Sequence, residues 1–177
     1  NDARTILQDG LAYDRCQVGV VTDMDGVEQL AAFDVHEQEQ MTKVLRTQVD
    51  VVLDHGAAVL NGADVQVAAL APLCDGSVVL YAQDANLPAI VEHRADEESG
   101  RAVFVKNDRV VLATGHSEHV LGRLSDLTFG RNAVAPDTDT LLAAIATAWA
   151  LDISPDLIGA GIKTFEPEQA APDTASA

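Results

Sequence analysis

Short apolar runs that alternate with segments of helical spacing constrain this chain more strongly than any other feature of its sequence. Four runs rich in valine, leucine and alanine are predicted as strands: residues 17–22, 49–53, 56–61 and 77–81. The first has apolar residues on both faces, which is typical of a parallel strand covered by helices. Strands and helices that alternate in this way need crossover connections, so the sequence predicts an α/β fold with a mostly parallel sheet.

Helices are predicted before, between and after these strands: residues 2–13, 35–48, 64–73, 139–151 and about 154–165. Asp64 suits an N-cap, because its carboxylate can accept hydrogen bonds from free amides of the first turn. Ser154 and Pro155 begin the last helix, with serine as its cap and proline at its first position. A tight turn at residues 54–56 is expected to separate the second strand from the third.

The pattern changes after residue 87. Antiparallel strands are predicted at residues 89–94, 101–106 and 109–114, with a further short strand at 121–129. Asn107 and Asp108 are expected to form a turn between two of them, because both residue types tolerate a positive φ. The predicted fold class is therefore α/β, with a mostly parallel sheet, flanking helices and a small antiparallel sheet.

The charge of the chain excludes two classes of partner. The sequence has 28 Asp and Glu residues against 11 Lys and Arg residues, a formal net charge of −17. Lys and Arg make the contacts to nucleic-acid phosphates, so no nucleic-acid partner is expected. An anionic membrane surface would repel the chain for the same reason. Apolar residues make up 47% of the 177 residues, which suffices for the core of one domain.

Nothing in the sequence indicates secretion or membrane insertion. No uninterrupted apolar window of about 18 residues occurs, and no basic segment precedes an apolar stretch near the first residue. The expected location is therefore the cytoplasm. Cys16 and Cys74 could form one disulfide, but reduced core thiols are the favoured interpretation in a chain that is not secreted.

Three strings could carry chemistry, and each has a simpler structural interpretation. Asp23 and Asp25 follow the carboxyl end of a strand, where ligands and Mg²⁺ collect in open α/β sheets. The favoured interpretation is two loop acids in an acidic protein. His116 and His119 could share a metal on a helix, but the surrounding glycines favour a loop without a third ligand. Residues 159–164 do not match a phosphate loop and are interpreted as a helix with small residues for close packing.

Several longer strings occur together in a characteristic order. They are residues 6–22, 46–53 with 56–61, 101–105 with 109–115, and 148–151 before 155–158. In this order they resemble the bacterial cyanophycin synthetase family, within its Mur-ligase-like half. The resemblance extends from about Ala3 to Phe165, and no single string is diagnostic alone.

The resemblance implies the later part of a central ATP-binding domain, a parallel α/β sheet with a small antiparallel sheet attached. Residues 1–165 would form this part, and residues 166–177 a flexible tail. Its expected divisions are a parallel part at about 1–86, an antiparallel insert at about 87–131 and C-terminal helices at about 137–165. In the family, ATP and Mg²⁺ activate an aspartate side chain of the polymer as an acyl phosphate, and the amine of arginine then attacks it.

The chain departs from the family where polar site residues are expected. Asp23 stands where the family has the Asn of a Thr-Asn pair, and Gln29 where it has a metal-binding His. Thr140 replaces an Asn, and Asn61–Asp64 replaces an Asn-Ala-Asp-Asp string. The family's phosphate loop and following C-terminal domain have no counterpart in the sequence. We therefore expect a truncated and degenerate relative.

The leading hypothesis is a relative without independent catalysis, because framework strings are kept while site residues change. No catalytic or cofactor-binding residue is assigned, no metal ligand beyond the weak candidates Asp23 and Asp25, and no cofactor for the isolated chain. It would act in cyanophycin metabolism as a homodimer or with a cyanophycin synthetase chain. The alternative is a fragment of an ATP-dependent amide ligase that adds arginine to aspartate side chains, with a partner supplying the phosphate loop. A third possibility is a module whose acidic surface binds arginine-rich polymer.

Overall fold

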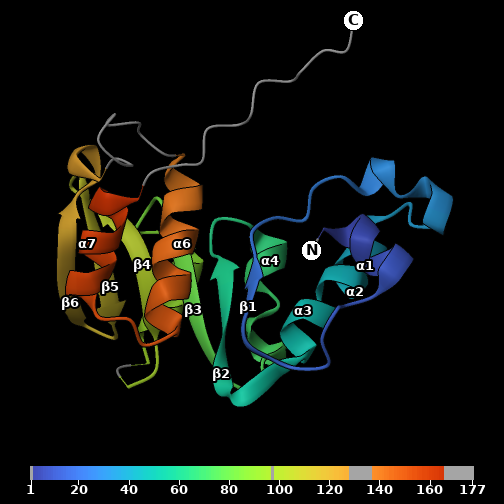
Figure 1. The fold of residues 1–177 in the computed structure, drawn as a ribbon, viewed down its shortest axis with the longest axis horizontal. Coiled ribbons are helices and arrows are strands. Elements are labelled where there is room, and N and C mark those ends of the chain that lie inside the picture. The colour runs from blue at the N-terminus through green and yellow to red at the C-terminus, as the bar shows by residue number, and fades with distance from the viewer. Residues whose placement is uncertain (1, 97, 128–136, 166–177) are drawn as a thin grey trace, which may run out of the picture.

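A six-stranded sheet organises the chain, and its strands lie side by side in the order in which they occur in the sequence (Figure 1). The computed structural model describes residues 2–96, 98–127 and 137–165. The strands are β1 (Cys16–Val21), β2 (Val52–Asn61), β3 (Ser77–Ala82), β4 (Arg101–Lys106), β5 (Arg109–Thr114) and β6 (Ser117–Arg123). Strands β1 to β4 are parallel, and β5 and β6 are antiparallel to their neighbours. The predicted α/β class is confirmed.

One face of the sheet carries all the crossover connections. These are α2 (Gln38–Leu45), α3 (Thr47–Asp50), α4 (Val65–Ala68) and α5 (Pro88–Arg94), with the 3₁₀ turns η1 (Val27–Gln29), η2 (Ala31–Phe33) and η3 (Ala71–Leu73). Helix α1 (Ala3–Asp9), which precedes β1, lies on the same face. Each crossover moves the chain one strand in the same direction, so connections of one hand must lie on one face. Met41, Val67 and Ile90 accordingly share an apolar cluster with Leu60 and Phe104 of the sheet.

The opposite face is covered by the last two helices, α6 (Thr138–Ala150) and α7 (Pro155–Thr164) (Figure 1). Helix α6 lies across β2, β3 and β4, where Leu142 and Ile145 pack in one cluster with Val59 and Val79. The Ser154 hydroxyl caps α7 by accepting from the amide of Leu157. The predicted cap and the two predicted helices are therefore confirmed.

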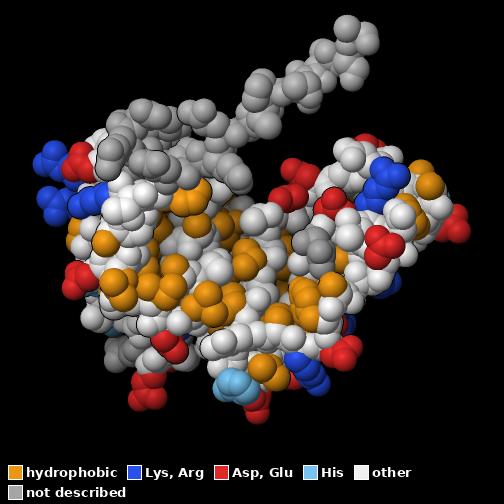
Figure 2. All heavy atoms as spheres, in the orientation of Figure 1, with side chains coloured by type: hydrophobic (Ala, Val, Ile, Leu, Met, Phe, Trp, Pro, Cys, Tyr) orange, Lys and Arg blue, Asp and Glu red, His pale blue; other side chains and the backbone are white. Residues whose placement is uncertain are grey.

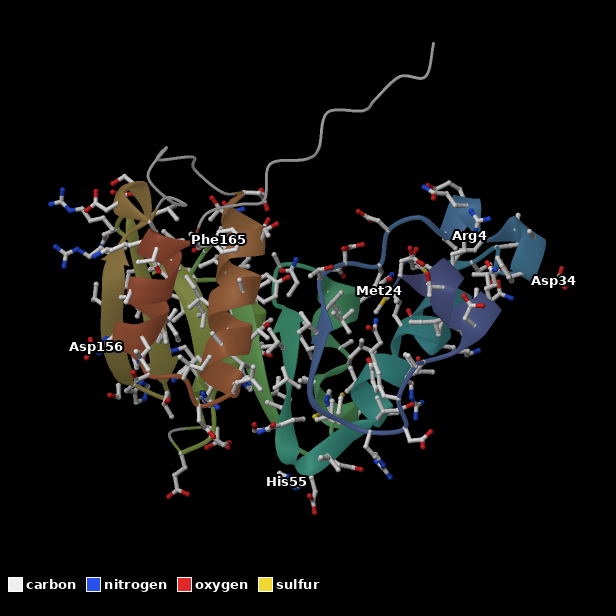
Figure 3. The ribbon with its side chains drawn as sticks, viewed as in Figure 1. Arg4, Met24, Asp34, His55, Asp156 and Phe165 are labelled. Atoms are coloured by element: carbon white, nitrogen blue, oxygen red, sulfur yellow. The ribbon has the colours of Figure 1, made fainter. Side chains whose placement is uncertain are left out.

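The predicted turn at residues 54–56 is wrong, because β2 continues through it as one strand of 10 residues. Cys16 pairs with Val52 and Val18 with Ala57, so β2 advances five residues while β1 advances two. Asp54 and His55, among the extra residues of β2, are exposed. Figure 3 shows His55 at the amino end of the sheet. The turn signal in the sequence marks these extra residues. The predicted strand at 49–53 is likewise wrong at its start, which belongs to α3.

The predicted strand at residues 89–94 is also wrong, because this segment forms the helix α5. Pro88 occupies its first turn, where a fixed φ and a missing N–H are tolerated. A helical crossover is what allows β4 to lie parallel to β3. Strand β4 thereby joins the antiparallel β5 and β6 to the parallel strands in one continuous sheet.

The antiparallel part otherwise follows the sequence pattern. Asn107 and Asp108 have φ values of 51° and 58° and form the predicted turn between β4 and β5. Strand β6 begins at Ser117, earlier than the predicted strand at 121–129, and is followed by the 3₁₀ turn η4 (Leu124–Asp126). Residues 128 and 129 of that prediction lie outside the described residues. No helix in the described ranges is long and apolar enough to cross a membrane.

Candidate functional site

The carboxyl ends of β1, β2 and β3 meet at one edge of the sheet, and polar residues follow each of them. The side-chain amide of Asn61 donates to the carbonyl of Thr22 over 2.9 Å, linking the ends of β2 and β1. The side-chain amide of Gln83, after β3, donates to Oδ2 of Asp139 in the first turn of α6 over 3.0 Å. The carboxyl-edge cluster below consists of Thr22, Asp23, Asn61, Gln83 and Asp139.

This edge carries a negative potential. Tyr81, near the end of β3, is buried, and its burial raises the pKa of the phenol well above its usual range. The carboxylates of Asp139, Asp23 and Asp137 raise it further, in that order. All three carboxylates therefore lie close enough to disfavour the phenolate. Tyr81 remains a neutral hydroxyl at physiological pH.

Thr140, which resemblance placed at a family site position, takes part in the cap of α6. Oδ2 of Asp137 accepts from the backbone amide of Thr140 over 2.9 Å and from its hydroxyl over 3.0 Å. These hydrogen bonds hold the pKa of Asp137 below its usual range, because they favour the ionised carboxylate. The hydroxyl of Thr140 is thus engaged within its own helix turn.

Asp23 and Asp25, the weak metal candidates, are both exposed. The hydroxyl of Thr22 donates to Oδ2 of Asp23 over 2.6 Å, and the amide of Asp25 donates to Oδ1 over 3.2 Å. Both oxygens of Asp23 are therefore engaged in the local turn. Among the described residues, no group of three or more His, Cys, Asp and Glu side chains could hold a metal ion. A cation at Asp23 and Asp25 stays a prediction.

Gln29, the third altered family position, lies away from these contacts. It is exposed at the end of η1, where its backbone amide donates to the carbonyl of Gly26 over 3.0 Å. Within the described part of the chain, no hydrogen bond joins its side chain to the carboxyl-edge cluster. The structure therefore brings Asp23 and Thr140 to one edge of the sheet and does not join Gln29 to them.

The other sequence candidates are separate from this edge. His116 lies in a turn and His119 on the exposed β6, so they do not share a helix. Cys16 and Cys74 are free, half-buried thiols. Burial, and to a smaller degree the nearby Cys74, raises the pKa of Cys16, which disfavours a reactive thiolate.

Sequence reasoning missed four residues of this edge: Tyr81, Gln83, Asp137 and Asp139. A usable signal was present, because Gln83 lies two residues after a predicted parallel strand and Asp137 two residues before a predicted helix. The carboxyl ends of parallel strands and the starts of helices are where polar ligands bind in α/β sheets. The positions could thus be found from element order, although their contacts could not.

Comparisons with known proteins bear on the origin of this arrangement. No family model matches the chain. A curated cyanophycin synthetase from Geminocystis herdmanii is 29% identical over 163 residues, and one from Synechocystis sp. is 30% identical over 161 residues. The chain is similar to cyanophycin synthetases. The alignments cover 92% and 90% of this chain but 18% of each relative.

The similarity to cyanophycin synthetases therefore confirms the expected resemblance for nearly all of the chain. A third relative, from Crocosphaera subtropica, is 28% identical over 162 residues and is matched to the same extent. The chain spans about a fifth of the length of these curated relatives. The activity and partners of the full-length relatives are therefore only proposed for this chain.

Proposed function

We propose that this chain acts in cyanophycin metabolism by association, with a second copy of itself or with a cyanophycin synthetase chain, and has no independent ligase activity. The observation that carries the proposal is the edge formed by β1. Among the described strands, β1 pairs only with β2. Exposed edges present unpaired backbone groups and favour pairing with another chain.

The sheet face beside this edge supports the same proposal. Val18 and Val20 of β1 point to the face covered by α6 and α7 but are only half-buried there. Figure 2 shows apolar side chains over α6 and α7 and over the strands next to them. Apolar surface that continues across several elements is typical of a protein interface.

The carboxyl-edge cluster supports the absence of independent catalysis. Phosphate groups of a nucleotide are bound by backbone N–H groups, by Lys and Arg, or through a bound cation. Here Asp23, Asp137 and Asp139 give the edge the charge of the phosphates themselves. A nucleotide would be repelled from this edge unless a partner supplied positive charge.

Size-exclusion chromatography with light scattering tests the association directly. We expect a dimer at micromolar concentration, and a mixed complex when a cyanophycin synthetase is added. Val20→Lys should weaken both, because it places a charge on the β1 face. Val91→Lys is the matched control, since Val91 is 55% exposed on α5, on the opposite face. A stable monomer that binds no synthetase contradicts the proposal.

The alternative proposal is that the chain is part of an ATP-dependent amide ligase that adds arginine to aspartate side chains. Its support is the position of the polar groups, since Asn61, Gln83 and Asp139 lie where open α/β sheets bind ligands. Calorimetry with ATP and Mg²⁺ separates the two proposals. ATP affinity of the isolated chain favours the ligase. No affinity of the isolated chain, and no ATP binding in the mixture beyond that of the synthetase alone, favours association alone.

A further inference from the structure

A hollow of about 590 Å³ lies over β5, β6 and the turn that precedes β5, on the side of the sheet away from α6. The side chains used below are Lys106, Arg109, Val111, Glu118, Val120 and Arg123. Three of the 11 Lys and Arg residues of a chain with net charge −17 line this hollow, together with the two carboxylates of Asp108 and Glu118. The lining therefore carries a small net positive charge in a protein that is strongly acidic as a whole.

A β-bulge brings the two arginines together. In the register of β5 and β6, Arg109 pairs with Arg123, Val110 with Gly122 and Val111 with Val120, so β6 has one extra residue, Leu121. Side chains alternate between faces along a strand, and an extra residue reverses that alternation. Arg123 thus faces the same side as Val120, while Leu121 packs into the core under α7.

Lys106, at the other end of the hollow, is already ion-paired. Oε2 of Glu118 lies 2.8 Å from Nζ of Lys106, and its Oε1 lies 3.0 Å from Nη2 of Arg94. The guanidinium of Arg94 also lies over the ring of Phe104, 4.7 Å from its centroid. Glu118 is therefore a structural member of the wall and does not compensate the arginines.

Arg109 and Arg123 lack such compensation within the described part of the chain. Neither guanidinium makes a hydrogen bond or an ion pair with another described residue, including Asp108, which also lines the hollow. Like charges directly opposite each other on neighbouring strands are destabilising. The bulge creates this unfavourable pair, and an anionic ligand bound between the two side chains would relieve it.

We propose that this hollow binds an acidic peptide. Guanidinium groups pair with carboxylates through two parallel hydrogen bonds, and two adjacent arginines suit adjacent acidic side chains. The hollow is as large as sites for extended ligands, far beyond a single phosphate group. Val111 at its floor and the half-exposed Val120 offer apolar contact to the peptide's methylene groups. The assignment does not depend on the proposed ligase ancestry.

The test is a nuclear magnetic resonance titration of the full chain with acetylated, amidated tetra-aspartate. We expect shifts confined to β5, β6 and their turn, and an affinity at least tenfold above that for tetra-asparagine. Arg123→Gln and, separately, Arg109→Gln should each weaken binding at least tenfold. Arg4→Gln is the matched control, because Arg4 is exposed on α1 at the other side of the molecule (Figure 3).

One further variant and one further ligand are included in the titration. Arg123→Lys keeps the positive charge but loses the paired hydrogen-bond donors of the guanidinium. This variant should therefore bind the peptide more weakly than wild type and more tightly than Arg123→Gln does. Inorganic phosphate is titrated in parallel. Absence of shifts with tetra-aspartate, equal affinity in the Arg→Gln variants, or phosphate binding as tight as peptide binding would each overturn the assignment. Both arginines are exposed, and circular dichroism verifies that the variants fold.

Discussion

Arg101 of β4 lies over the ring of Trp149 of α6, with its guanidinium carbon 4.1 Å from the ring centroid. The same guanidinium donates from Nη2 to the carbonyl of Trp149 over 2.8 Å. Arg101 thus joins the end of α6 to β4, the strand at which the sheet changes from parallel to antiparallel pairing. It combines a cation–π contact with a charged hydrogen bond.

Arg101→Lys should therefore destabilise the protein although the charge is kept. The lysine cannot stack on the ring and reach the carbonyl in the same way, so we expect a loss of about 1–2 kcal/mol. Urea unfolding followed by Trp149, the only tryptophan, measures it. Arg4→Lys, at an exposed site on α1, should change stability by less than about 0.5 kcal/mol. Equal stability of the two variants would show that the stack contributes nothing.

A methyl group at Gly19 should be strongly destabilising. A Cβ there would lie 2.4 Å from the carbonyl oxygen of Gln48 and 2.9 Å from Cγ2 of Val52. Since a backbone oxygen is the nearest atom, α3 and β1 would have to separate, and Gly19→Ala should cost roughly 1–3 kcal/mol. Thermal unfolding with circular dichroism measures the loss.

Gly161 provides the opposite case on α7. Its Cβ would have no atom within 4 Å, so the sequence-based expectation of close packing at this glycine is wrong. Gly161→Ala should stabilise the helix by about 1 kcal/mol, because alanine loses less backbone entropy. A destabilised Gly161→Ala protein, measured in the same thermal unfolding assay, would contradict this account.

His93 should make stability depend on pH near neutrality. Burial lowers the pKa of His93, while its contacts with the carbonyl of Val78 and the backbone of Arg101 oppose the shift. The unfolded chain then takes up the proton first, so this contribution is present above pH 6.5 and is lost as the pH falls from there through the lower folded pKa. The stability advantage of wild type over His93→Gln should therefore shrink below pH 6.5.

Urea unfolding of both proteins between pH 8 and pH 5 gives this difference. His119→Gln, at an exposed position of β6, separates the effect of burial from the loss of a histidine. A constant difference between wild type and His93→Gln across this pH range would contradict the prediction.

Glu118 should make stability depend on pH in a more acidic range than His93 does. The hydrogen bond from Lys106 is the largest effect and lowers the pKa of Glu118. Burial, the second largest effect, raises this pKa, and the hydrogen bond from Arg94 lowers it further. Its contribution is present above the unfolded pKa near 4.5 and is lost as the pH falls below it. Wild type should exceed Glu118→Gln by about 1 kcal/mol at pH 7, and the difference should vanish in acid.

Glu92→Gln is the control, because it removes the same charge from an exposed site on α5. It should change stability by less than about 0.5 kcal/mol at pH 7. Chemical unfolding at pH 7, 5 and 3.5 provides the measurement. An advantage over Glu118→Gln that persists undiminished at pH 3.5 would assign the effect to packing.

Features set by neighbouring residues were predictable from the sequence. The carboxylate of Asp64 caps α4 by accepting from the amides of Gln66 and Val67, as its position predicted. The prediction failed where tertiary structure decides. Ile90 and Val91 favour a strand by type, yet they lie in α5, because a parallel β4 requires a helical crossover. Local propensity carries no information about that requirement.

The sites were harder to predict than the elements. Asp23 and Thr140 are far apart in sequence, and only the parallel order of the strands together with the return of α6 places them at one edge. The pairing of Arg109 with Arg123 depends on a single extra residue in β6, and strict alternation would have placed Arg123 on the opposite face. Gly122, next to the extra residue, is compatible with a bulge, but a glycine alone does not set the pairing register.

The agreement between strand order in the sheet and strand order in the chain has a consequence for synthesis. Each strand can pair with one that has already left the ribosome, so the sheet can grow from β1 outward as translation proceeds. The face over Val59, Val79 and Val103 is covered only when α6 and α7 emerge. A nascent chain arrested before residue 138 would therefore carry a formed but half-covered sheet, the form most exposed to chaperones and to aggregation.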